Sequence, residues 1–303
     1  MESSGRPDRH HHELGRDDRW FEWVSRRRDA GLRGGALAYL DAIRDAVLAG
    51  AALGIGDRLV DVGCGDGLIG IAACDRVGPE GEVVFVDISP AVLALCKRKA
   101  ELCPRCRTRF LATEATELAG VWDGEADAVA ARSVLIYVAD KRAAFRAFHR
   151  VLVPGGRVSI WEPIKSRIHP EEDGRFLGYD VSAVWPLASR VREVYEEMRP
   201  RPDASMDFDE GDLETAAEEA GFAGVEVTLK EFERTPKPVD GWDAFLDNSP
   251  NPMAPTIREA VEMSLDRVEA RTLFRNLRPA AEAGSGVVRY AVAELRARKQ
   301  ADP

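Results

Sequence analysis

Three glycines at alternate positions mark the stretch of this chain that is best suited to hold a ligand. Gly63, Gly65 and Gly67 follow an apolar segment that ends with Asp61 and Val62. Glycine adopts positive φ readily and has no side chain, so a ligand can lie close to its backbone. Apolar residues then return at helical spacing, and the first N–H groups of a helix have no partner within it. The segment 59–70 predicts a strand, a turn and a helix that bind a nucleotide-like cofactor, although a purely structural turn fits the same pattern.

The spacing of these glycines discriminates between cofactors. A dinucleotide-binding G-x-G-x-x-G motif would place its third glycine at position 68, which is Leu68. The order present is D-x-G-x-G-x-G, and the acids Asp61 and Asp66 would repel a phosphate but not a sulfonium amino acid. This order resembles motif I of the class I methyltransferases that depend on S-adenosylmethionine (SAM), with Asp61 beside the ammonium group of the cofactor. The resemblance implies SAM contacts from Asp61, Gly63, Cys64, Gly65 and Gly67.

A second acid follows the next apolar segment. The strand predicted over 82–89 includes Asp87 near its end, 20 positions after Gly67, and Ser89-Pro90 are suited to begin the next helix. A carboxylate at the tip of this strand accepts hydrogen bonds from both ribose hydroxyls in nucleotide-binding α/β folds. We therefore expect Asp87 and its neighbour Ile88 to bind the cofactor.

The resemblance extends through the next two predicted strands. In the family, an acid after the third strand accepts a hydrogen bond from the adenine amino group and the next backbone N–H meets the ring; Glu114 and Ala115 occupy these positions, although Glu114 is equally suited to be a solvated loop acid. The most specific match is the string 150–157, RVLVPGGR, which resembles the helix-turn-strand after motif IV. Residues 55–165 thus resemble a SAM-dependent methyltransferase. The sequence 132–137, RSVLIY, is similar to the small-molecule branch that includes ubiquinone and arsenite methyltransferases, and places Arg132 and Ser133 near the cofactor.

Departures from other branches narrow the expected substrate. Nucleic-acid amino methyltransferases have an [N/D]-P-P-[Y/F] tetrad after the fourth strand, and this chain lacks it. It also has no cysteine after Cys106 to bind arsenite. No metal site is expected. SN2 transfer from SAM needs an aligned acceptor, exclusion of water and at most a base. The catalytic candidates are Glu162, Tyr137 and His169; Glu162 would orient a substrate or stabilise a cationic intermediate, whereas a lone loop histidine also fits an ordinary surface position.

The spacing of apolar residues predicts an α/β fold: a doubly wound, mostly parallel seven-stranded Rossmann-like sheet whose last strand is antiparallel. N-terminal helices precede it and two helical inserts interrupt it. Trp20 and Trp23 in the first helix either pack in the core or cap the cofactor, because aromatic faces stabilise a sulfonium cation. For the last segment, a helix over 289–298 fits the sequence equally well. The expected segments are a disordered 1–18, a helical cap 19–54, a SAM-binding core 55–162, a substrate lid 163–208, further core 209–233, a helical insert 234–285 and the last strand with the C-terminus 286–303.

Composition limits the partners. The 303 residues carry a net charge of −10, which repels nucleic acid and anionic membranes unless a local patch overcomes it. There is no run of 18 apolar residues and no signal peptide, so a cytoplasmic protein is expected. We expect it to act on a small-molecule substrate as a monomer or homodimer. The C-x-x-C pair at 103 and 106 lacks the rest of a zinc set, so all five cysteines are expected as free thiols.

Three functions fit these features. The first is methyl transfer from SAM to an O, N or C atom of a small, apolar or aromatic metabolite. The second is a SAM-binding protein with a non-methylating or regulatory role. The third is a nucleotide-dependent oxidoreductase, which the glycine spacing disfavours.

Overall fold

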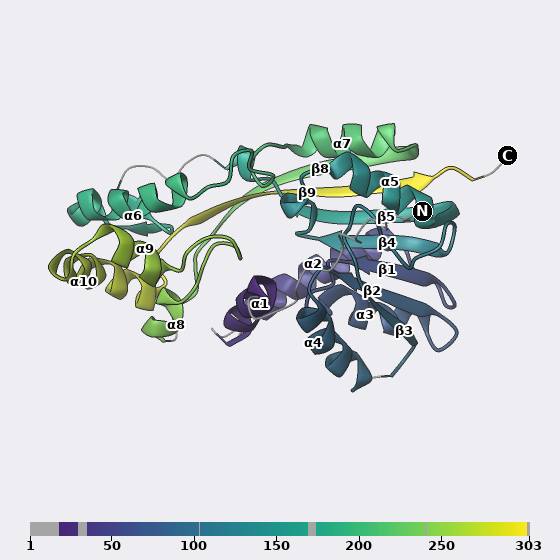
Figure 1. Ribbon diagram of the computed structural model, residues 1–303, viewed down its shortest axis with the longest axis horizontal. Helices are drawn as coiled ribbons and strands as arrows, with labels where there is room; N and C mark the ends of the chain where they lie inside the picture. The colour runs from purple at the N-terminus through teal and green to yellow at the C-terminus, as the bar shows by residue number, and fades with distance from the viewer. Residues whose placement is uncertain (1–17, 30–34, 103, 169–173, 240, 302–303) are drawn as a thin grey trace, which may run out of the picture.

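The computed structural model describes residues 18–29, 35–102, 104–168, 174–239 and 241–301. The central feature is a seven-stranded sheet in the order β3-β2-β1-β4-β5-β9-β8 (Figure 1). Strands β1 to β5 are parallel, and β9 is antiparallel to both β5 and β8. The predicted fold class is confirmed. The strands of the sheet are β1 (Arg58–Val62), β2 (Glu82–Asp87), β3 (Arg107–Ala112), β4 (Ala126–Arg132), β5 (Leu152–Pro163), β8 (Phe222–Arg234) and β9 (Val288–Lys299).

Helices cover both faces of the sheet because its parallel strands are apolar on both sides. On one face, α2, α3 and α4 pack on Leu59, Val83 and Phe85. On the other, α5 and α7 pack on Val60 and Val84. These helices are α2 (Gly35–Ala51), α3 (Leu68–Val77), α4 (Pro90–Glu101), α5 (Lys141–Val151) and α7 (Glu210–Glu219).

Most of the remaining helices form a lobe at one end of the sheet, on the left of Figure 1. It is built from the two predicted inserts, which lie far apart in the sequence but share one apolar core that includes Val191, Leu246 and Leu273. The separate lid and helical insert of the sequence interpretation are therefore one body. The lobe contains β6 (Arg175–Phe176), β7 (Tyr179–Asp180), η3 (Ser182–Val184), α6 (Trp185–Glu197), α8 (Trp242–Leu246), α9 (Ile257–Ser264) and α10 (Arg267–Ala283).

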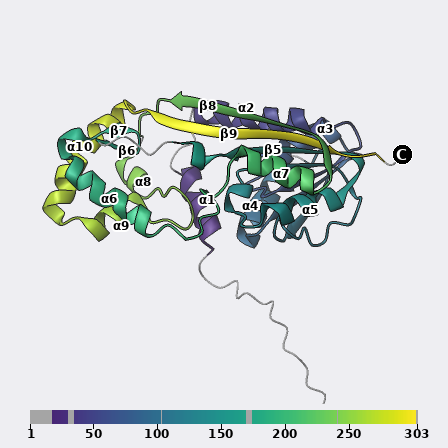
Figure 2. The same cartoon turned by 90° about the horizontal axis from the view of Figure 1, so that it is seen from above.

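Helix α1 (Arg19–Asp29) lies between the sheet and the lobe (Figures 1 and 2). It belongs to the predicted N-terminal helical segment, whereas residues 1–17 and the predicted disorder there lie outside the described residues. Among the described residues, no helix combines the length and the apolar character needed to cross a membrane.

The structure gives the boundaries of three segments. The stretch 127–138 contains the end of strand β4 at Arg132 and then a loop with a short 3-10 helix, η1 (Leu135–Tyr137). The stretch 257–277 contains parts of two helices, because Asp266 caps the second one through the N–H groups of Val268 and Glu269. The last segment is strand β9, and the helical alternative is wrong.

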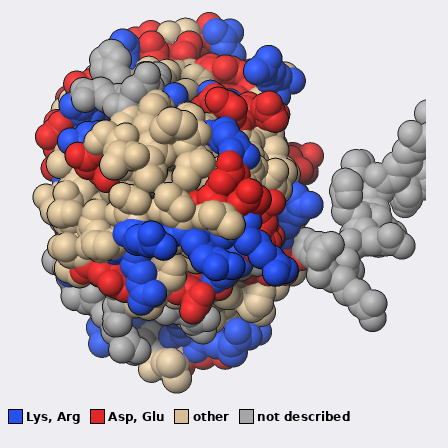
Figure 3. All heavy atoms as spheres, turned by 90° about the vertical axis from the view of Figure 1, so that its left-hand side faces the viewer, with Lys and Arg blue, Asp and Glu red and all other residues tan. Residues whose placement is uncertain are grey.

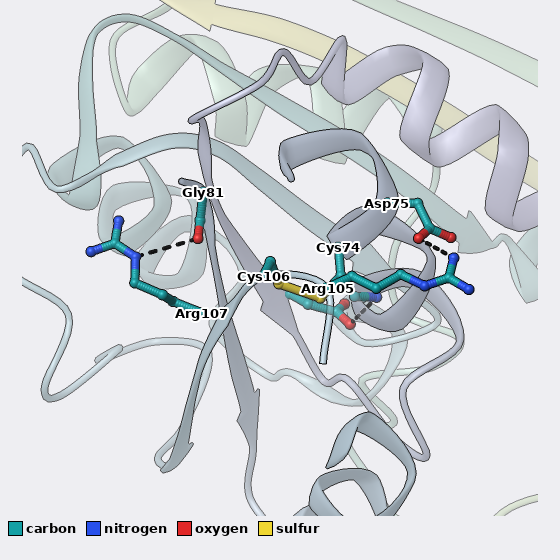
Figure 4. Close-up of a disulfide and its surroundings, with 8 residues drawn as sticks. Cys74, Asp75, Gly81, Arg105, Cys106 and Arg107 are labelled. Carbon is teal, nitrogen blue, oxygen red and sulfur yellow. Dashed lines mark hydrogen bonds and ion pairs between the residues drawn. A yellow bond between two sulfur atoms is a disulfide. The ribbon is translucent and has the colours of Figure 1, made fainter. Parts of the chain in front are cut away.

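The expectation of five free thiols is also wrong. Cys74 on α3 and Cys106 before β3 form a disulfide (Figure 4), while Cys64 and Cys96 are free and Cys103 lies outside the described residues. The two bonded cysteines are 32 positions apart in sequence, but the packing of α3 on β2, which pairs with β3, brings their Cα atoms to 5.1 Å. That separation is in the normal range for a disulfide. An ion pair between the neighbouring Asp75 and Arg105 joins the same two segments (Figure 4).

Candidate functional site

The three glycines of the loop after β1 have different surroundings, although all three have positive φ. A Cβ on Gly63 would lie 2.3 Å from Val134 Cγ2, and one on Gly67 would lie 2.5 Å from Ile71 Cδ1. A Cβ on Gly65 would have no atom within 4 Å. Gly63 and Gly67 therefore allow close packing, and Gly65 is the glycine whose backbone faces open space that a ligand can enter.

Asp61 lies beneath this loop rather than in the open space. Its side chain is 1% exposed, and Oδ2 accepts a hydrogen bond of 2.8 Å from the N–H of Gly70 in the first turn of α3. Burial raises the pKa of Asp61 to about 7, although this bond and the charge of Arg132 oppose the change. The carboxylate thus holds the start of α3. A place beside a ligand's ammonium group, implied by the family resemblance, stays a prediction for Asp61.

Asp87 lies at the end of β2 with its carboxylate directed to the same loop. Oδ2 accepts a 3.0 Å hydrogen bond from Gly65 N–H, and Oδ1 accepts one of the same length from Ser89 N–H. Each carboxylate oxygen can accept further bonds. The pKa of Asp87 is raised by burial, with the backbone bonds opposing this. The adjacent Ile88 is 53% exposed, an apolar surface at the mouth of the loop.

Glu162 holds the loop that follows β4. The side chain is 0% exposed, and its oxygens accept three backbone hydrogen bonds: 2.7 Å from Val134, 2.9 Å from Leu135 and 3.2 Å from Ile136. Burial raises its pKa to about 7, against the effect of these bonds. The carboxylate of Glu162 is thus bonded to the backbone of the loop that leads into Tyr137, and its catalytic role stays a prediction.

Tyr137 is the catalytic candidate that lies beside an element covering the site. Its ring meets that of Trp20 on α1 edge to face, with centroids 4.9 Å apart. Helix α1 is further attached by Trp23, whose Nε1 donates a 3.2 Å hydrogen bond to Ser249 O of the lobe. On the other side, Asp18 before α1 accepts a hydrogen bond from the hydroxyl of Ser89. Helix α1 thus connects the segment after β2, the loop after β4 and the lobe.

The other predicted residues lie around this region with less defined contacts. Glu114 is exposed and Ala115 is half-buried after β3. Arg132 is half-buried, and its charge acts on both Asp61 and Glu162. His169 lies outside the described residues.

Ser133 has φ of +55°, unusual for a residue other than glycine, and its N–H donates to Trp161 O at 2.9 Å. Cys64 is buried within the glycine loop. Its Sγ lies 3.6 Å from Gly65 O, and a hydrogen bond with Cys96, together with burial, raises the pKa of its thiol well above the ordinary value.

Sequence reasoning missed two residues that tie α1 in place, Asp18 and Ser249. The N-cap position of Asp18 was readable, because an acid before an apolar helical segment accepts backbone bonds, here from Phe21 N–H at 3.0 Å. The contact at Ser249 involves a backbone carbonyl, which leaves no signal in the sequence.

The donor set fits an adenosyl amino-acid cofactor. Three groups lie together at the carboxyl ends of the parallel strands. They are the Gly65 backbone, which faces open space, the Asp87 carboxylate, which can accept further hydrogen bonds, and the exposed side chain of Ile88. This edge is where ligands bind in such folds. Among the described residues, no group of three or more His, Cys, Asp or Glu side chains is placed to hold a metal ion.

Comparisons with known proteins find methyltransferases among the sequence relatives of this chain. Residues 59–156 match the family model described as a methyltransferase domain. The chain is 25% identical over 197 residues to an arsenite methyltransferase of Halobacterium salinarum, covering 65% of this chain and 44% of that protein. It is 32% identical over 174 residues to a chloroplastic 2-phytyl-1,4-beta-naphthoquinone methyltransferase of Arabidopsis thaliana, covering 55% of this chain and 65% of that protein. In both cases the match spans less than two thirds of the relative.

The fold has relatives among solved structures. The YcgJ protein of Bacillus subtilis superposes with a TM-score of 0.53 at 14% identity, over 86% of this chain and 98% of that one. At this identity the similarity concerns the fold alone. The sequence matches and the sheet order lead to one conclusion: residues 59–156 form a methyltransferase domain, and the chain is similar to the class I SAM-dependent methyltransferases of the small-molecule branch.

Proposed function

We propose that this protein transfers a methyl group from SAM to an O, N or C atom of a small, apolar or aromatic metabolite. The single observation that carries the proposal is the convergence of the Gly65 backbone, the Asp87 carboxylate and Ile88 beneath a helix that places Trp20 against Tyr137. When bound, SAM supplies a methyl group already activated for nucleophilic attack.

The residues of this chain have three tasks in that reaction. Asp87 binds the ribose hydroxyls, the glycine loop binds the amino-acid end, and Ile88, Glu114 and Ala115 contact the adenine. Arg132 and Ser133 border the cofactor at the end of β4, while Glu162 fixes the loop that presents Tyr137.

Helix α1 excludes water from the acceptor site. Its Trp20 and Trp23 are both half-buried and meet each other edge to face, with centroids 6.3 Å apart. Aromatic walls favour an apolar or aromatic acceptor and also stabilise a sulfonium cation. This lining supports the substrate class, and it supports a role for α1 in capping the cofactor.

The cofactor assignment is tested by calorimetric titration with S-adenosylhomocysteine, with NAD as the competing ligand. Asp87→Asn replaces a charged acceptor, so we expect its affinity to fall at least about tenfold. Asp75→Asn is the matched control, because Asp75 pairs with Arg105 at the surface of α3. Binding of NAD in preference to S-adenosylhomocysteine would refute the proposal.

The transfer itself is tested by incubating the protein with methyl-labelled SAM and a panel of quinones, phenols and aromatic amines. We expect label in an apolar acceptor, and Tyr137→Phe and Trp20→Ala each to lower kcat/KM. Cofactor binding without transfer to any acceptor, including to a polar comparison panel, would favour a SAM-binding protein with a regulatory role.

A further inference from the structure

Helix α10 carries a line of arginines along its exposed side. Arg267, Arg271, Arg275 and Arg278 are all exposed. Their spacing of four, four and three residues places them on one side of the helix over about 16 Å. The opposite side of α10 packs into the lobe through the buried Leu273, Leu277 and Ala281. The orientation of the arginine line is therefore fixed by the core of the lobe.

Few of these charges are neutralised within the protein. Arg278 pairs with Glu282 at 2.7 Å. In the described part of the chain, no ion pair joins Arg267, Arg271 or Arg275 to an acid. The nearby Asp266 caps the helix with its carboxylate, and Glu269 pairs with Arg190 at 2.6 Å on another side of α10. The arginine line thus presents a local positive charge in a protein whose net charge is −10.

The surface view agrees with this arrangement. Figure 3 faces the end of the molecule where Figure 1 places α10, and it shows a band of Lys and Arg across that end beside a broad area of uncharged residues. Two large apolar side chains are exposed where α9 meets α10: Met263 at 60% and Val268 at 69%. Val268 directly follows the first arginine of the line, so apolar and basic side chains adjoin each other.

We propose that this face of α10, with Met263 and Val268, docks on the surface of an anionic phospholipid bilayer. Guanidinium groups bind lipid phosphates in bidentate fashion, and each basic residue near an anionic bilayer favours binding. The exposed Met263 and Val268 gain from contact with the boundary of the acyl chains, which a polyanion in water does not offer. A bilayer touches only the outer end of the lobe, and repulsion from acids of the protein that lie farther from it than a Debye length is screened.

A single-stranded nucleic acid is the less favoured ligand. Such ligands are bound by aromatic side chains on which bases stack, together with basic grooves. Of the exposed large hydrophobic residues in the described chain, the one aromatic is Trp122, which follows β3 in the sheet domain rather than the lobe. The arginine line alone would attract a polyanion, but binding a nucleic acid would not remove the exposed Met263 and Val268 from water.

The test is co-sedimentation of the full chain with vesicles of phosphatidylcholine containing phosphatidylglycerol, and with vesicles of phosphatidylcholine alone. We expect binding to the anionic vesicles only, weakened by added salt. The triple variant Arg267→Gln, Arg271→Gln, Arg275→Gln removes three charges, and its partition coefficient should fall about 100-fold. The matched control is Arg98→Gln, Arg142→Gln, Arg146→Gln, which removes three exposed charges from α4 and α5 and should bind as the unmodified protein does.

Further arms distinguish the alternatives. Met263→Ser with Val268→Ser should lower binding to anionic vesicles about tenfold, because two apolar contacts are lost. The proposal is overturned if both triple variants bind vesicles equally, or if the apolar double variant binds undiminished. It is also overturned if labelled single-stranded RNA, and not vesicles, binds in a manner that depends on α10, or if the α10 variant changes the oligomeric state instead. None of these readouts involves methyl transfer, so the outcome is independent of the proposed function.

Discussion

Two loops at the carboxyl edge of the sheet reach similar backbone conformations by different means. The loop after β1 turns with glycines, whose φ values are +62°, +54° and +95° at Gly63, Gly65 and Gly67. The loop after β4 turns at Ser133, with φ of +55°, and is held by the three bonds to Glu162. The first loop achieves its shape through local residues, and the second depends on a buried acid from another strand.

The two loops are also in contact. Val134 of the second loop lies where a side chain on Gly63 would be, and each loop has a buried carboxylate beneath it, Asp61 and Glu162. At the same edge of the site, the loop after β1 depends on the conformational freedom of glycine, and the loop after β4 depends on hydrogen bonds to a residue distant in sequence. The variants below test whether this difference is real.

The largest effect is expected from Glu162→Ala. It leaves three backbone N–H groups without their acceptor, and each unsatisfied buried donor costs about 1–3 kcal/mol. Because these costs are not additive, we expect the free energy of unfolding to fall by about 3–5 kcal/mol in urea titrations, with loss of activity. Exposed Glu231→Ala on β8 is the control and should change stability by less than about 0.5 kcal/mol. Equal effects from the two variants would show that Glu162 does not hold the loop.

The glycine loop should respond unequally to alanine. At positive φ an L-residue costs about 1–2 kcal/mol, which applies to both Gly63→Ala and Gly65→Ala. Gly63→Ala also displaces Val134 and should lower the unfolding free energy by about 3 kcal/mol in total. Gly65→Ala should lower it by about 1 kcal/mol, yet weaken S-adenosylhomocysteine binding more than its small cost in stability suggests. If the two variants were equally unstable, the division between a packing glycine and an open one would be wrong.

The buried carboxylates should give both loops the same pH dependence. The pKa of Asp61 and of Glu162 is raised to about 7 in the folded protein, so the folded state holds protons that the unfolded chain releases at lower pH. The stabilisation is therefore fully present below the ordinary carboxyl pKa and is lost as pH rises through about 7. For each group we expect the unfolding free energy to fall by about 2 kcal/mol between about pH 5 and about pH 8.

This dependence is checked with variants that do not titrate. Asp61→Asn and Glu162→Gln should each flatten the pH profile of unfolding by a similar amount. A profile that only one of the two variants flattens would mean that the loops differ in electrostatics as well as in backbone chemistry.

The contrast between the loops also explains how far the sequence could be interpreted. The glycine motif, Asp87 and the string at 150–157 are local patterns, so the sheet could be predicted from them and the cofactor end of the site could be proposed. Glu162 was readable as an acid at a strand end, but its partners lie 26 to 28 positions earlier and are backbone amides, which have no residue type to recognise. The disulfide and the joined lobe were missed for the same reason, because both depend on tertiary contacts between distant segments.

The smallest effect concerns the turn at Ser133. If the loop after β4 holds this residue in a strained conformation, then Ser133→Gly relieves about 1–2 kcal/mol of strain. Glycine also gives the unfolded chain more freedom, which offsets about 0.4–1 kcal/mol of that gain. We therefore expect a net rise of about 0.5 kcal/mol in the unfolding free energy by urea titration, whereas Gly65→Ser, the reverse exchange in the other loop, should lower it. A loss of stability in Ser133→Gly would mean that the serine side chain itself holds the turn, and the two loops would then resemble each other in their use of local residues.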